Sequence, residues 1–200
     1  AEDYLDLHYN CSKCQDTGYY KGELCDCFKR VCGNLSAKEM NKNAQVQLSN
    51  FSTFKLSYYS GADLNVMQHI LEYAKNYADN FKNNSNSILM FGKTGLGKTH
   101  LSLAIANVVL SKGYSVIYDS VINILRKIER EHFGRGLQND TLSLIIDCDL
   151  LILDDLGTEF ETQFYSSAIY NIINSRLNGN KPTIVSTNLD YSGIEKRYDE

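Results

Sequence analysis

One stretch of eight residues decides how this chain folds: Gly92-Lys93-Thr94-Gly95-Leu96-Gly97-Lys98-Thr99. It fits the G-x-x-x-x-G-K-[ST] pattern of a phosphate-binding loop, and it lies between an apolar run and an amphipathic segment as such a loop requires. The glycines let backbone N–H groups approach a β-phosphate, and a helix that begins near Lys98 directs its positive end to the same place. The stretch therefore predicts a strand, a loop that binds the phosphates of ATP, and a helix.

Three side chains of this region have expected roles. The Lys98 ammonium is expected to reach the β- and γ-phosphate oxygens, and the Thr99 hydroxyl is expected to hold Mg²⁺. His100 follows directly and is counted with the loop among the expected cofactor-binding residues. A glycine-rich turn with a surface lysine is the alternative interpretation.

Apolar runs and amphipathic segments alternate along the rest of the chain. Apolar residues recur at helical spacing between 62 and 81, which predicts a helix lying on a core. Short apolar runs such as 150–153 are typical of strands buried on both faces, and their alternation with helices implies an α/β fold with a parallel sheet. We expect strands at 87–91, 114–118, 150–153 and 183–186, and helices at 98–110, 121–132 and 163–177.

Polar side chains follow two of the predicted strands. Asp154 and Asp155 come directly after the apolar run 150–153, and a doubly wound sheet would bring them next to the phosphate loop. Asp154 is expected to order Mg²⁺ through water, and Asp155 is expected to polarise the attacking water as general base. Asn188 would sense the γ-phosphate or the lytic water. The alternatives are aspartates that begin a turn or cap a helix, and an asparagine that only forms a turn.

Five of the six cysteines fall within the first 32 residues. Two closely spaced pairs in turn-rich sequence suit four thiolates around one tetrahedral Zn²⁺, and the expected ligands are Cys11, Cys14, Cys25 and Cys27. Cys32 and His8 are spare candidates for the fourth position. Disulfides and unligated thiols are the alternatives, although crowding of this kind favours a metal site.

Length and composition set the expected organisation. A chain of 200 residues with 43% hydrophobic content suffices for one α/β domain and a small appendage. We expect a cysteine-rich zinc-binding module at 1–33, a linker and docking segment at 34–60, and a nucleotide-binding core at 61–200. The chain shows neither a signal peptide nor an apolar run of about 18 residues, so we expect a cytoplasmic protein without a membrane segment.

The formal charge of −4 gives no global attraction to nucleic acid, so DNA binding would need a local basic face. The helix predicted at 121–132 carries Arg126, Lys127 and Arg130 outside its apolar stripe, and this edge is a candidate for contact with a single strand. Because Glu129 and Glu131 lie among these cations, an ordinary solvated surface is the alternative.

Three segments together carry a family resemblance: residues 92–100, 151–159 and 171–189. They resemble the AAA+ ATPases of the DnaC/DnaI helicase-loader group, which also includes IstB-like transposition helpers. The run Asp154-Asp155-Leu156-Gly157 is more specific than the phosphate loop alone. The resemblance covers about residues 50–200 and implies an AAA+ core that assembles with other subunits, binds single-stranded DNA and helps to place the replicative DNA helicase on it.

The resemblance also implies an arginine finger and a small helical lid, which are not found before residue 200. Neither Arg176 nor Arg197 can be assigned as the finger by position, so we expect slow ATP hydrolysis, and self-assembly only when a C-terminal part is present. Loaders that resemble DnaI carry a zinc module, which favours a loader over a transposition ATPase. A metabolic P-loop kinase and a pure interaction module are the remaining alternatives.

Overall fold

The computed structural model describes residues 9–43, 48–134 and 140–198. Its core is a four-stranded parallel sheet in the order β3-β6-β5-β4. The strands are β3 (Ile88–Phe91), β6 (Thr183–Thr187), β5 (Leu150–Leu156) and β4 (Val116–Ser120). The α/β class with a parallel sheet is thereby confirmed. Within the described residues, no helix combines the length and the hydrophobicity that crossing a membrane demands.

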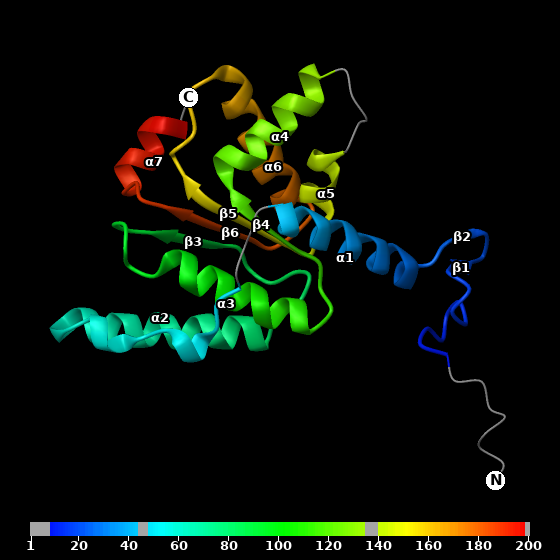
Figure 1. Cartoon of the computed structure of the whole chain (residues 1–200), viewed down its shortest axis with the longest axis horizontal. Helices are drawn as coiled ribbons and strands as arrows, with labels where there is room; N and C mark the ends of the chain where they lie inside the picture. The colour runs from blue at the N-terminus through cyan, green and yellow to red at the C-terminus, as the bar shows by residue number, and fades with distance from the viewer. Residues whose placement is uncertain (1–8, 44–47, 135–139, 199–200) are drawn as a thin grey trace, which may run out of the picture.

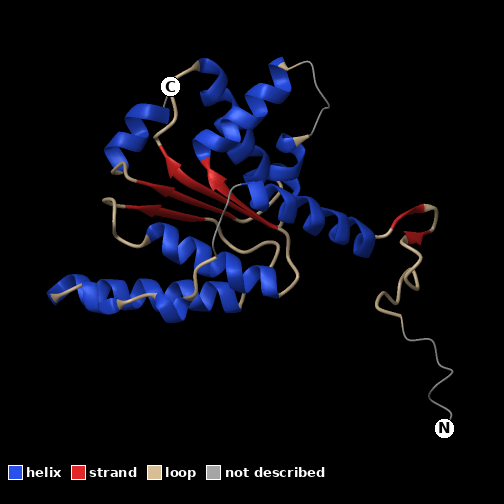
Figure 2. Ribbon diagram, viewed as in Figure 1, coloured by secondary structure: helices blue, strands red, loops and turns tan. Residues whose placement is uncertain are grey.

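Helices cover both faces of this sheet (Figures 1 and 2). One face carries α2 (Gly61–Asp79) and α3 (Lys98–Ser111). The other carries α4 (Val121–Phe133), α5 (Thr141–Asp147) and α6 (Gln163–Asn178), and α7 (Tyr191–Tyr198) follows β6. The chain is therefore a three-layer structure in which the phosphate loop joins β3 to α3.

The central strand β5 shows why the apolar run at 150–153 forms a strand. All four residues of the run are at most 2% exposed. Leu151 and Leu153 pack in the core under α4 and α6, whereas Leu150 and Ile152 pack in the core under α2 and α3. The period of two along a strand thus buries an unbroken apolar run on both faces.

Before the core lie the hairpin strands β1 (Tyr19–Tyr20) and β2 (Glu23–Leu24) and helix α1 (Asp26–Asn43), followed by two short 3₁₀ turns, Phe51–Thr53 and Leu56–Tyr58. The sequence predicts a linker from residue 34, but α1 runs through the 33/34 boundary to Asn43. Helix α5 was also not predicted, and β4 begins two residues later than expected. The domain division itself stays a prediction.

Helix α1 has no apolar stripe from which it could be predicted, because amide side chains dock it on the sheet. The Asn41 Nδ2 donates to the Val116 carbonyl at 2.7 Å, and the Tyr118 N–H donates to Asn41 Oδ1 at 3.0 Å. Asn34 donates to the Gly113 carbonyl at 2.8 Å. Since β4 is an edge strand of the described sheet, α1 occupies backbone groups that would otherwise stay open.

Arg176, one of the two arginines weighed as a finger, lies in the core and is 0% exposed. Its Nε donates to the Thr183 hydroxyl at 2.8 Å. Its other nitrogens donate to four main-chain carbonyls: Ile145, Ile146, Cys148 and Pro182. Arg176 therefore joins α6 to the entries of β5 and β6 and has a structural role.

We predict that Arg176→Met lowers the free energy of unfolding by at least about 3 kcal/mol, because buried carbonyls lose their donor. Urea denaturation followed by circular dichroism measures the loss. Arg130→Met is the matched control, since Arg130 is exposed, and its effect should stay within about 0.5 kcal/mol. Equal effects of the two substitutions would contradict the structural role.

Candidate functional site

The phosphate loop lies at the carboxyl end of β3, where a doubly wound sheet binds its ligands. Gly97 immediately precedes α3 and has φ 78°, in the left-handed region that favours glycine. A Cβ at this position would lie 2.7 Å from a ring carbon of Phe54. Both the backbone conformation and the close approach of this ring therefore require glycine at position 97.

The ammonium of Lys98 lies over the loop that precedes it. Its Nζ donates to the carbonyls of Gly92 at 2.6 Å and Lys93 at 3.0 Å, and to Asn188 Oδ1 at 2.8 Å. The structure thus brings together two residues that the sequence singled out separately, 90 positions apart. Asn188 follows β6, which pairs with β3, so the order of the strands brings Asn188 next to the loop that follows β3.

The second contact joins the start of α3 to β5. The Thr99 hydroxyl donates to Asp154 Oδ2 at 3.0 Å and lies 3.3 Å from Oδ1. Asp154 is 4% exposed, and it also accepts hydrogen bonds from Tyr118 and Ser186. Hydroxyl and carboxylate oxygens are ligands that Mg²⁺ prefers, so these residues fit the expected metal. Tyr118 and Ser186 were given no role from the sequence, because nothing in a strand residue's type shows which carboxylate it meets.

Asp155 has an unusual backbone. Its φ is 57°, and the pairing of β5 with β6 shifts register between Leu153 and Leu156. Its N–H donates to the Ser186 hydroxyl at 3.0 Å. Partial burial, and then the negative charge of Asp154, raise the pKa of Asp155, while Lys98 lowers it. A carboxyl with a raised pKa beside the loop is suited to accept a proton.

The segment at 50–59 packs along the phosphate loop. His100 Nε2 lies 3.1 Å from the carbonyl of Asn50, and its ring meets the Phe54 ring edge to face at 5.4 Å. The Tyr59 hydroxyl donates to the Leu96 carbonyl at 3.4 Å. His100 thus joins the phosphate loop to the segment at 50–59. This segment is the far end of the stretch 34–60, which the sequence predicts to dock on the core.

The four expected zinc ligands come together. The sulfur atoms of Cys11, Cys14, Cys25 and Cys27 all lie within 4.8 Å of one another, and every cysteine is a free thiol. The Cys11 and Cys25 sulfurs are 3.9 Å apart, and those of Cys14 and Cys27 are 3.3 Å apart. A tetrahedral site with Zn–S bonds of about 2.3 Å has sulfurs roughly 3.8 Å apart, so the cluster fits zinc.

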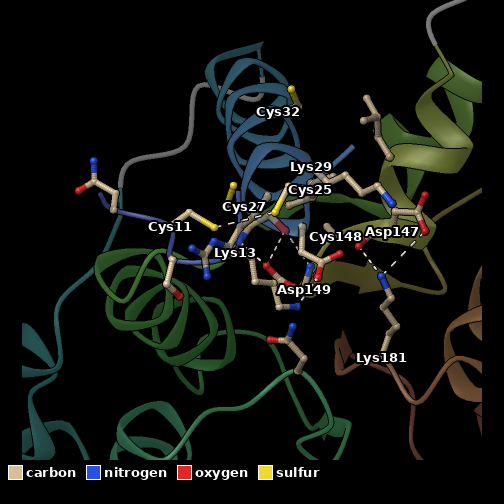
Figure 3. Close-up of a pocket in the computed structure, with 18 residues that line it drawn as sticks. Cys11, Lys13, Cys25, Cys27, Lys29, Cys32, Asp147, Cys148, Asp149 and Lys181 are labelled. Atoms are coloured by element: carbon tan, nitrogen blue, oxygen red, sulfur yellow. Dashed lines mark hydrogen bonds and ion pairs between the residues drawn. The ribbon is translucent and has the colours of Figure 1, made fainter. Parts of the chain in front are cut away.

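The two spare ligand candidates have different outcomes. Cys32 lies further along α1, is exposed, and its sulfur is apart from the cluster in Figure 3. His8 lies outside the described residues. A backbone hydrogen bond from Cys14 is the main cause that lowers the pKa of the Cys11 thiol to about 7. The lowered pKa favours the Cys11 thiolate, the form that binds metal, whereas a hydrogen bond with Cys14 raises the pKa of the Cys27 thiol.

A cavity of about 1010 Å³ separates the cysteine cluster from the core (Figure 3). Its lining on the core side includes Ser115, Asp149 and Lys181, which precede β4, β5 and β6. The cavity therefore lies at the amino ends of the strands, away from the phosphate loop. Its lining carries both signs of charge, as in the pairs Lys13 with Asp26 and Lys181 with Asp147.

The three candidate DNA contacts on α4 separate into two kinds. Lys127 Nζ lies 2.7 Å from Oδ2 of Asp119, which is buried, so this lysine is held against the core. Arg126 and Arg130 are exposed. The acidic neighbours are turned to other helices: Glu129 accepts from the Tyr165 hydroxyl, and Glu131 accepts from the N–H of Thr141.

Aromatic rings gather at the end of α4. The rings of His132 and Phe133 lie 4.7 Å apart, and both lie 5.4 Å from the ring of Phe164. Phe133 is 70% exposed. Phe164 comes from α6 and joins the rings of α4 only in the fold, so the sequence alone does not predict this cluster.

Arg197, the other arginine weighed as a finger, is ion-paired within the chain. It lies 3.3 Å from Glu159 Oε1 and 2.8 Å from Glu161 Oε1. Glu159 is buried, and its other oxygen accepts from the Gly157 N–H at 2.9 Å. Arg197 therefore fastens α7 to the loop that follows β5.

Comparisons with known proteins agree with this geometry. Residues 35–199 match the family described as IstB-like ATP binding protein. The chain is 32% identical over 124 residues to the replicative helicase loader DnaC of Buchnera aphidicola (strain Bp), covering 61% of this chain and 50% of that protein. It is 30% identical over 127 residues to DnaC of Escherichia coli (strain K12), covering 63% and 52%. The chain thus spans about half the length of these relatives.

Solved structures show the same fold. A DnaC helicase loader superposes with a TM-score of 0.63 at 24% identity, over 75% of this chain and 86% of that one. DnaI superposes with a TM-score of 0.63 at 21% identity, over 80% and 79%. The resemblance seen in the sequence is confirmed. The chain belongs to the IstB-like ATP-binding protein family, as a DnaC-like AAA+ protein.

Proposed function

We propose that this protein is an ATP-dependent loader of the replicative DNA helicase, in which ATP binding and hydrolysis switch its assembly and its hold on single-stranded DNA. The observation that carries the proposal is the pair of contacts that closes the phosphate loop, Lys98 with Asn188 and Thr99 with Asp154. The relatives named as replicative helicase loaders supply the class of partner. The cysteine cluster supports the choice of a loader.

The side chains of this site divide the work on ATP. Lys98 would neutralise charge on the β- and γ-phosphates. Thr99 and Asp154 would hold Mg²⁺, which would supply positive charge for phosphoryl transfer. Asp155 accepts a proton from the attacking water, and its raised pKa suits that task. Asn188 contacts Lys98 and so is placed to report the γ-phosphate to β6.

Turnover depends on assembly in this proposal. Within the described residues, Arg176 is buried and Arg197 is paired with two glutamates, so neither is offered to a neighbouring site. An arginine supplied by an adjacent subunit raises phosphoryl transfer by roughly 10³ to 10⁵ in comparable enzymes. We therefore expect slow hydrolysis by the isolated chain.

The proposed DNA contact lies on α4. Arg126 and Arg130 are exposed, and their helix ends in the exposed ring of Phe133, next to His132 and Phe164. Arginines that meet phosphates beside rings that stack on bases are the usual means of holding a single strand without reading its sequence. Lys127 is excluded from this proposal because of its ion pair with Asp119.

A transposition ATPase is the second candidate, because the matching family is described as IstB-like. Both candidates use the same nucleotide site, so only the partner separates them. To separate them, the tagged chain is immobilised and mixed with either the purified replicative helicase or a purified transposase from the same organism. We predict that the helicase is retained and the transposase is not, and that Mg²⁺-ATP changes the amount retained. Capture of the transposase alone would contradict the loader assignment.

We also propose a structural Zn²⁺ ion bound by Cys11, Cys14, Cys25 and Cys27, whose sulfur atoms lie at the spacing of a tetrahedral site. The metal would join the turn at 11–14 to the first turn of α1 and replace a core that this module lacks. In this proposal the zinc ion takes no part in ATP hydrolysis.

We predict one Zn²⁺ per chain in protein purified with reduced thiols, measured by elemental analysis. Cys14→Ser should lower the stoichiometry towards zero, because three thiolates hold the metal poorly. Cys32→Ser is the matched control and should keep one ion, since Cys32 lies outside the cluster. A wild-type stoichiometry near zero, or loss of zinc in Cys32→Ser, would overturn the assignment.

A further inference from the structure

The carboxylate of Asp154 is held by hydroxyl groups from three different elements. Thr99 at the start of α3 donates to it, Tyr118 on β4 donates to Oδ2 at 2.5 Å, and Ser186 on β6 donates to Oδ1. The β4 residue opposite Asp154 is Ser120, so the long tyrosine side chain reaches two residues along the strand to meet it. These hydrogen bonds fix the orientation of both carboxylate oxygens of Asp154.

The three donors are not equivalent once a metal is bound. With Mg²⁺ bound, the Thr99 hydroxyl would serve as a metal ligand and would contribute less to orienting Asp154. Tyr118 and Ser186 then remain to hold the carboxylate. Ser186 also accepts the N–H of Asp155, whereas the Tyr118 hydroxyl has Asp154 as its acceptor in the described structure. Removing the Tyr118 hydroxyl would therefore change the hydrogen bonding of Asp154 and leave the hydrogen bond from the Asp155 N–H in place.

The position of Tyr118 is itself fixed from outside the sheet. Asn41 of α1 accepts the Tyr118 N–H at 3.0 Å and donates to the Val116 carbonyl at 2.7 Å. These two bonds hold the backbone of β4 on either side of Ile117, directly before the residue whose ring reaches the site.

From this geometry we propose that Tyr118 is a positioning residue for Mg²⁺-dependent nucleotide binding, which it serves by orienting the carboxylate of Asp154. The inference rests on the proposed function as an ATP-binding protein. In this proposal β4 helps to set the metal affinity of a site that lies on β5 and α3. Helix α1 contributes as well, because Asn41 holds the backbone of β4. Groups that orient a metal ligand in this way commonly change metal affinity by 10- to 100-fold when removed.

The test uses Tyr118→Phe, which keeps the ring and removes the hydroxyl. Tyr77→Phe is the matched control, because the Tyr77 hydroxyl donates to the Asn86 carbonyl, away from the site. Binding of the non-hydrolysable analogue AMPPCP is measured by calorimetry across a titration of Mg²⁺, and again in EDTA. In Tyr118→Phe, the Mg²⁺ concentration that gives half of the full gain in affinity should rise about tenfold. Affinity in EDTA should not change, and Tyr77→Phe should behave as wild type.

Each other outcome has a distinct meaning. Wild-type Mg²⁺ dependence in Tyr118→Phe would overturn the role of Tyr118 while leaving the nucleotide site intact. An equal loss of affinity with and without Mg²⁺, together with a lower unfolding midpoint, would show that the hydroxyl only stabilises the fold and would also overturn the proposal. Failure of the wild-type chain to bind AMPPCP at all would overturn the proposed nucleotide function instead.

Discussion

The burial of the Asp154 carboxylate is the constraint on which the arrangement of the site depends. This carboxylate lies at the carboxyl end of β5, is almost fully buried, and accepts a hydrogen bond at 3.0 Å from Thr99 in the first turn of α3. A buried carboxylate is costly unless it is paired or hydrogen-bonded, and here hydroxyls from α3, β4 and β6 supply the partners. The sheet order β3-β6-β5-β4 places β4 and β6 on either side of β5, so Tyr118 and Ser186 reach Asp154 from the two neighbouring strands.

Much of the fold could be predicted from the sequence, because its signals are local. The unbroken apolar run at 150–153 and the stripe at 62–81 report burial directly, and the glycine pattern at 92–97 fixes the turn between β3 and α3. Helix α1 could not be predicted, since Asn34 and Asn41 dock it through backbone groups of distant residues. A polar helix of this kind has the composition of a linker and differs only in its tertiary partners.

The site divides in the same way. Lys98, Thr99, Asp154 and Asn188 follow from motif and strand order, and the structure brings them together. Tyr118, Ser186 and the ring of Phe164 were missed because each acts through a neighbour on another strand or helix. The basic edge of α4 was read as one face, yet the buried Asp119 removes Lys127 from it. The sequence shows which residues of a helix are charged, but it does not show which of them form ion pairs with buried residues.

In this proposal the loop at 92–99 binds the phosphates of a nucleotide. Calorimetric titration of ATP into Lys98→Ala and Lys93→Ala tests this binding, because both substitutions remove a lysine of the same loop. Only the Lys98 ammonium lies over the loop carbonyls and reaches Asn188 in the described structure. We expect Lys98→Ala to stay folded and to lose at least tenfold in ATP affinity, about 1.4 kcal/mol, while Lys93→Ala binds ATP nearly as the wild type does. Unchanged ATP affinity in a folded Lys98→Ala protein would contradict this proposal.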